Sequence, residues 1–165
     1  MIALKIEDLK NFTRCLFIGE CFDRLQVREA EIVTYNTFHI DGTLQKGYYT
    51  EEEASALRPG DYSRWSVLKP ICCSLIRGKK LPQSFRIVMA ASRGQVKAFL
   101  EAQGLSFTPE QVTGLYLNLR YEEGKACCVT GTSLNIFSLD KSLEQAWDKA
   151  VEEMFRKNGI ACTVG

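Results

Sequence analysis

The fold is decided by residues 63–92, which read SRWSVLKPICCSLIRGKKLPQSFRIVMAAS. Five apolar side chains in the first half recur at the spacing of one helical face: Trp65, Leu68, Cys72, Leu75 and Ile76. Ile71 and Cys73 widen this face, so the predicted helix should be well buried. Pro70 predicts either a kink or two shorter pieces, 65–69 and 70–77, because proline removes one backbone hydrogen bond.

The end of this helix leads into a strand. Gly78 is predicted to end the helix in the left-handed conformation that glycine favours. Residues 85–91 then place apolar side chains on both faces, with Ile87 on one and Val88 on the other. A strand that is apolar on both faces is typical of the centre of a sheet, so Val88 is expected inside it.

Length and composition fit one globular domain, residues 1–165. The chain has 45% hydrophobic and 25% charged residues, both ordinary for such a domain. Its 21 basic and 20 acidic residues give a net charge of +1, which favours neither nucleic-acid nor membrane-surface binding. No apolar run is long enough for a membrane span. Glu7 and Asp8 come too early for a secretory signal, so a cytoplasmic protein is expected.

Seven cysteines include two adjacent pairs and no C-x-x-C motif. Adjacent residues of a strand point to opposite faces, so Cys127 and Cys128 cannot easily share a metal. The single histidine, His39, leaves the usual zinc ligand sets short of partners. We therefore expect buried, reduced thiols and no cofactor, with a redox or metal role as the alternative.

Strand and helix patterns alternate along the chain. The predicted elements are strand 1–6, helix 8–18, hairpin strands 22–28 and 31–41, helix 51–57, the central helix and strand, helix 95–103, hairpin 115–131 and helix 142–157. They predict an α+β domain whose mostly antiparallel sheet of five to six strands is packed by about four helices. The order strand, helix, hairpin, helix occurs twice, which suggests repeated halves, 1–78 and 82–160.

Local signals set several boundaries. Thr50 with Glu53, and Ser92 with Gln95, have the spacing of capping boxes that begin helices. Asp41-Gly42 is a typical turn dipeptide, and Pro59-Gly60-Asp61 predicts a break in the chain.

Two small clusters are candidates for chemistry. His39 and Asp41 lie two apart on a strand and face the same way, and a carboxylate beside an imidazole is half of a general-base device. The alternative is a histidine at a strand end beside a turn aspartate. No flanking motif identifies a nucleophile, so no catalytic residue is assigned.

The second cluster is the basic elbow, which we define as Arg77, Gly78, Lys79 and Lys80. Three cations beside a glycine turn could hold a phosphate or a nucleic-acid backbone. They also follow a helix C-terminus, whose partial negative charge attracts cations. Capping of the central helix is therefore the alternative explanation.

Three segments resemble a known family together: WSVLKPICCSLIRGKKLPQSF at 65–85, GLYLNLRY at 114–121 and CVTGTSLNIFSLDKSLEQAWD at 128–148. They are similar to an uncharacterised protein family of anaerobic low-GC Gram-positive bacteria, a domain of unknown function. The resemblance covers nearly the whole chain and implies a stand-alone bacterial cytoplasmic protein. It implies no reaction and no catalytic residues.

These observations favour a non-catalytic binding or assembly module that recognises a protein partner or itself. The alternative is an anion- or nucleic-acid-binding protein that uses the basic elbow. A third hypothesis is a small enzyme that uses His39 or a cysteine. A membrane partner is not expected.

Overall fold

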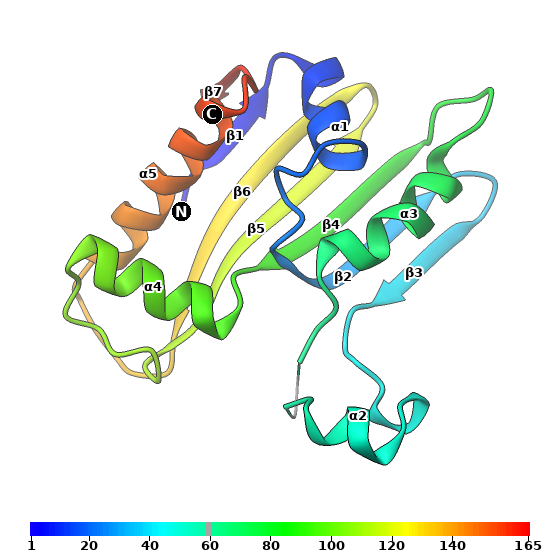
Figure 1. Ribbon diagram of the computed structural model, residues 1–165. Helices are drawn as coiled ribbons and strands as arrows, with labels where there is room; N and C mark the ends of the chain where they lie inside the picture. Colours follow the sequence, from blue (N-terminus) through cyan, green and yellow to red (C-terminus); the bar gives the residue numbers. More distant parts are fainter. Residues whose placement is uncertain (59–60) are drawn as a thin grey trace.

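The structure is a computed structural model that describes residues 1–58 and 61–165. Within them the chain forms a seven-stranded antiparallel sheet and five α-helices, shown in Figure 1. The predicted α+β class is therefore confirmed, while the predicted five to six strands and four helices are too few. The predicted break at Pro59 and Gly60 lies outside the described residues.

The sheet has the strand order β3-β2-β4-β5-β6-β1-β7. In that order the strands are β3 (Thr37–Asp41), β2 (Gln26–Val33), β4 (Ser84–Ala90), β5 (Val112–Glu122), β6 (Lys125–Leu134), β1 (Ala3–Ile6) and β7 (Cys162–Val164). The helices are α1 (Leu9–Phe17), α2 (Glu51–Ser55), α3 (Trp65–Ile76), α4 (Arg93–Gln103) and α5 (Ser142–Lys157), with a short 3-10 helix at Lys46–Tyr48. Strand β7 was not predicted because three residues are too few to show an alternating pattern.

Four helices, α1, α3, α4 and α5, lie against the same face of the sheet in Figure 1 and share one core with it. Strand β5 shows the division between the two faces. Its Leu117 and Leu119 are buried beneath the helices, whereas Tyr116, Asn118 and Arg120 point to the opposite side. No helix among the described residues packs on that side, which we call the uncovered face.

Strand β4 lies inside the sheet, as predicted, between β2 and β5. Ile87 is completely buried, but Val88 is only half-buried and points to the uncovered face. The prediction that Val88 lies inside the sheet is therefore right about the strand and wrong about shielding of the side chain from solvent. The reason is that the helices pack only on the Ile87 side.

Helix α3 differs from its prediction in two ways. It is one continuous helix across Pro70, which excludes the alternative of two pieces, and the kink stays a prediction. Its C-cap is Arg77 in an extended conformation, and Gly78 does not adopt the left-handed conformation. The helix is also only partly buried, because Val67 and Ile71 keep 61% and 52% of their surface exposed. Its inner side is anchored by Trp65, whose Nε1 donates to the Leu16 carbonyl at 2.7 Å.

The first hairpin has its turn at a different place from the predicted one. Strand β2 runs without interruption to Val33, and the chain turns around Tyr35 before β3 begins. Gly42 does not make the hairpin turn. It lies so close to β2 that a Cβ atom there would be 1.7 Å from the Val27 carbonyl oxygen.

The two proposed halves repeat the order of elements but not the strand pairing. Strand β4 pairs with β5 of its own hairpin, whereas β1 pairs with β6 and β7 and not with β2. The internal repeat therefore remains a prediction. Both capping boxes are confirmed, at the starts of α2 and α4.

Ile87 and Val88 are neighbours on β4 but differ in burial. Shortening each to alanine should therefore lower the free energy of unfolding by different amounts. Ile87→Ala should lower the free energy of unfolding by about 3 kcal/mol, because it opens a cavity beneath the helices. Val88→Ala should lower it by about 1 kcal/mol or less, because Val88 lies on the uncovered face. Urea unfolding of both variants measures this, and equal losses would contradict a sheet that is covered on one face only.

Candidate functional sites

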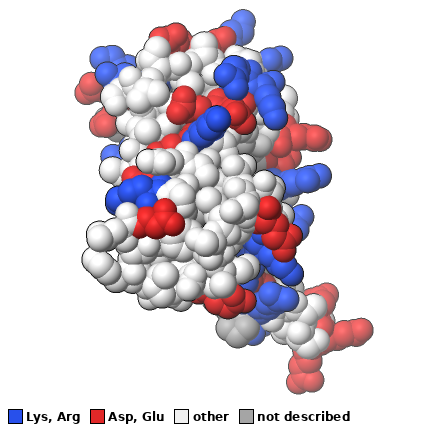
Figure 2. Space-filling model, turned by 90° about the vertical axis from the view of Figure 1, so that its left-hand side faces the viewer, with Lys and Arg blue, Asp and Glu red and all other residues white. Residues whose placement is uncertain are grey.

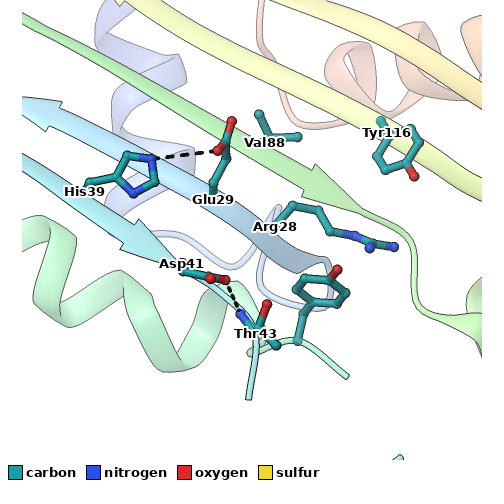
Figure 3. Close-up of a pocket in the computed structure, with 8 residues that line it drawn as sticks. Arg28, Glu29, His39, Asp41, Thr43, Val88 and Tyr116 are labelled. Atoms are coloured by element: carbon teal, nitrogen blue, oxygen red, sulfur yellow. Dashed lines mark hydrogen bonds and ion pairs between the residues drawn. The ribbon is translucent and has the colours of Figure 1, made fainter. Parts of the chain in front are cut away.

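A pocket of about 360 Å³ opens on the uncovered face, where β2, β3 and the segment before α3 meet (Figure 3). It is lined by Arg28, Glu29, His39, Asp41, Thr43, Tyr62, Val88 and Tyr116. Both residues of the predicted His39–Asp41 pair are therefore in one pocket, at the edge of the sheet.

Arg28 is placed in this pocket by an irregularity of β2. The pairing of β2 with β4 shifts register between Val27 and Glu29, so Arg28 sits at a β-bulge. A bulge redirects a side chain out of the regular alternation. The Arg28 guanidinium carbon lies 3.9 Å from the ring centre of Tyr62 and 5.6 Å from that of Tyr116. Figure 3 shows this side chain reaching away from His39 and Asp41, toward Tyr116.

Two glycines permit the close approaches that place the tyrosines. Gly42 allows close packing on β2, and the Ser63 N–H donates to the Gly42 carbonyl at 2.9 Å, which brings Tyr62 beside Arg28. Gly114 lies beneath the ring of Tyr116, and a Cβ atom there would be 2.2 Å from the ring. The aromatic contacts of Arg28 thus depend on the absence of two side chains.

The charges of the pocket are unequally neutralised. Glu29 binds Arg86 at 2.8 Å through one carboxylate oxygen and faces the His39 ring at 3.8 Å through the other. Asp41 accepts a hydrogen bond from the Thr43 N–H at 2.9 Å. This bond, with smaller contributions from the Thr43 hydroxyl and His39, lowers the pKa of Asp41, so its carboxylate is ionised at neutral pH. Among the described residues, the Arg28 side chain has no hydrogen-bond or ion-pair partner, and its Nε is buried.

The pocket differs from the general-base device considered above. The nearest carboxylate partner of His39 is Glu29 on the neighbouring strand, and the structure gives no hydrogen bond between His39 and Asp41. No cysteine lines the pocket. Sequence reasoning missed Arg28, Tyr62 and Tyr116, because a bulge and a contact between distant segments leave no local pattern.

The basic elbow lies at another place, after the C-terminal end of α3. Arg77 caps α3 through its backbone N–H and approaches the Cys73 sulfur at 3.8 Å. Lys79 and Lys80 are exposed and form no ion pair within the described part of the chain. Neither lysine lines the pocket on the uncovered face, and both their capping of α3 and their binding of an anion stay predictions.

The outer face of α3, which we define as Val67, Pro70 and Ile71, is an exposed apolar surface without charge. Lys69 does not interrupt it, because its ammonium group turns inward to Asp23 at 2.8 Å. Leu81, next to the basic elbow, is 83% exposed. An isolated exposed apolar residue is ordinary, but a helix that is apolar on both sides is normally buried on both.

An acidic arm, which we define as residues 44–58, projects from the body and contains α2. None of the α2 residues is buried, and Glu51, Glu52 and Glu53 are exposed. Figure 1 places α2 beyond the N-terminal end of α3, while the basic elbow lies at the other end. In Figure 2 the acidic side chains of the lowest, projecting part are turned to solvent.

A second exposed apolar surface belongs to the loop between β6 and α5. Ile136, Phe137 and Leu139 are 41%, 90% and 81% exposed. The face shown in Figure 2 has a large area without charged side chains in its lower half, and basic and acidic groups are mixed above it. No strongly basic surface is visible on that face.

The cysteines are all free, and the described residues contain no group of three or more ligands that could hold a metal. Burial raises the pKa of the Cys72 thiol to about 11 and that of Cys128 further. The pKa of Cys21 is raised to about 11, first by burial and then by the neighbouring Cys15 thiol. Thiols with raised pKa values are poor nucleophiles at neutral pH.

The fold and its surfaces define an α+β domain with helices on one face of the sheet, a charged pocket on the other, and an exposed apolar helix. No described helix has the length and apolar character needed to cross a membrane. The chain belongs to a family of unknown function (DUF5721), which matches residues 15–163. No curated protein and no solved structure matches it. The resemblance to a domain of unknown function is thus confirmed, and the bacterial origin and cytoplasmic location stay predictions.

Proposed function

We propose that the protein is a non-catalytic assembly module that recognises a second copy of itself through the outer face of α3. The observation that carries this proposal is the distribution of apolar residues around that helix. Trp65 and Cys72 fill the core on one side, yet Val67 and Ile71 stay more than half exposed on the other. Covering these side chains with apolar surface would be favourable, because burial releases water from them.

The charges around α3 favour a second copy as the partner. Assemblies of two identical chains usually have twofold symmetry, in which one patch meets itself. A twofold axis through the middle of α3 runs the two helices antiparallel. The acidic arm at the N-terminal end of one α3 then comes to the basic elbow at the C-terminal end of the other. Glu51 and Glu52 thus face Lys79 and Lys80 of the second chain, twice in each dimer.

The alternative function is binding of a polyanion by the basic elbow. The exposure of Lys79 and Lys80 favours it, since lysines without partners are free to contact phosphates. The near-neutral net charge of the chain does not favour it. Both functions use Lys79 and Lys80. They differ in the negative group that these lysines meet, which is the acidic arm of a second chain in one case and the phosphates of a polyanion in the other.

The first prediction concerns the apolar centre of the interface. Ile71→Asp should convert a dimer into a monomer in sedimentation velocity, because it places two carboxylates at the symmetry axis. At a protein concentration where the wild type is also monomeric, the melting temperature should change little, since Ile71 is 52% exposed in the single chain. Leu139→Asp is the matched control and should leave the dimer intact. A wild-type chain that stays monomeric at high concentration, or a dimer broken only by Leu139→Asp, would refute the proposal.

The second prediction concerns the charges. Lys79→Glu/Lys80→Glu should weaken dimerisation, and so should Glu51→Lys/Glu52→Lys, because each change brings like charges together. The variant with all four changes should recover the dimer, because the ion pairs are restored with reversed polarity. Failure to recover would show that the arm and the elbow do not meet. Binding of duplex DNA by the wild type, lost in Lys79→Glu/Lys80→Glu, would support the polyanion alternative instead.

A further inference from the structure

The Arg28 side chain has hydrogen-bond donors that no described residue uses, as is typical of a ligand-binding group. Its guanidinium group stacks on Tyr62 at 3.9 Å and has no ion pair among the described residues, although Glu29 is next to it in sequence. The aromatic ring attracts the flat side of the guanidinium group. The N–H donors at the edge of the guanidinium stay without a partner. A planar guanidinium presents those donors in a geometry that matches a carboxylate.

The same pocket holds one carboxylate, that of Asp41, which can accept further hydrogen bonds and an ion pair. The negative charge of Glu29 is paired with Arg86 at 2.8 Å. Asp41 has no ion pair among the described residues, and only its Oδ1 accepts a hydrogen bond, from Thr43. The pocket therefore contains one cation and one anion that the protein itself does not neutralise.

We propose that this pocket binds a small zwitterion of the amino-acid type, with its carboxylate on Arg28 and its ammonium group toward Asp41. The volume of about 360 Å³ lies in the range of small-molecule sites. Tyr62 and Tyr116 flank the Arg28 guanidinium and form apolar walls beside the proposed position of the carboxylate.

The surroundings of Arg28 favour a carboxylate over a phosphate. A phosphate group brings up to two negative charges, but Arg28 is the single uncompensated cation among the lining residues. Asp41 and Glu29 in the same pocket would repel the second charge. A monoanion whose own cation faces Asp41 meets no such repulsion.

The site is independent of the proposed assembly function. None of its lining residues belongs to the outer face of α3, the acidic arm or the basic elbow. Its shape depends instead on the bulge at Arg28, on Gly42, which allows close packing on β2, and on Gly114, which leaves space for the Tyr116 ring. Ligand binding can therefore be tested without changing the oligomeric state.

The experiment is a titration of the ¹⁵N-labelled full chain, followed by amide chemical shifts. The probes are the proteinogenic amino acids in small pools, acetate, and inorganic phosphate. We expect at least one amino acid to shift amides of β2 and β3 saturably at millimolar concentration, and acetate and phosphate to bind more weakly. Arg28→Gln should weaken amino-acid binding roughly tenfold or more, because it removes a charged hydrogen-bond donor.

Four further variants separate the contributions of the individual side chains to binding. Asp41→Asn should remove the preference for the amino acid over acetate while keeping acetate binding. Gly114→Ala should weaken binding by displacing the Tyr116 ring, with every charge retained. Lys97→Gln, which removes an exposed cation of α4 outside the pocket, should change nothing. Arg28→Lys keeps the charge and should still bind more weakly, which covers the case that Arg28→Gln does not fold.

Three results would overturn the proposal. One is phosphate binding as tight as that of the best amino acid. Another is amino-acid binding that is unchanged in both Arg28→Gln and Arg28→Lys. The third is the absence of any Arg28-dependent shift with all probes at tens of millimolar.

Discussion

Burial of one face of the sheet beneath α1, α3, α4 and α5 is the interaction on which the rest of the structure depends. It brings Leu117, Ile87 and Trp65 into a single core, and it fixes which side of each strand meets water. Because one helical layer covers one face, the opposite face is left for polar and charged side chains. The helices, in turn, have an outer side that nothing in the described chain covers at α3.

These two consequences place the two proposed sites on opposite sides of the sheet. The pocket around Arg28 belongs to the uncovered face, and the outer face of α3 belongs to the helical layer. A ligand and a second copy of the chain can thus be bound at the same time. The segment that carries Tyr62 joins the acidic arm to α3, so it is the direct covalent connection between the two surfaces.

Features that depend on neighbouring residues could be predicted from the sequence, and features that depend on pairing between distant segments could not. The capping boxes of Thr50 and Ser92 and the hairpin predicted at 115–131 are local, and all are confirmed. The exposure of Ile71 was missed because the spacing of apolar residues in the sequence is the same whether they pack into the core of their own chain or against another chain. His39 and Asp41 were found by spacing alone, whereas Arg28 enters the pocket only because β2 bulges against β4.

Two adjacent cysteines of β6 test the one-sided sheet most directly. Cys127 is half-buried on the uncovered face, and Cys128 is completely buried beneath the helices with a raised pKa. The measurement is brief alkylation of the reduced native protein, with the modified residue located by fragmentation in a mass spectrometer. A sheet covered on one face predicts modification of Cys127, and of Cys128 only after unfolding. Equal protection of both thiols, or faster modification of Cys128, would contradict it.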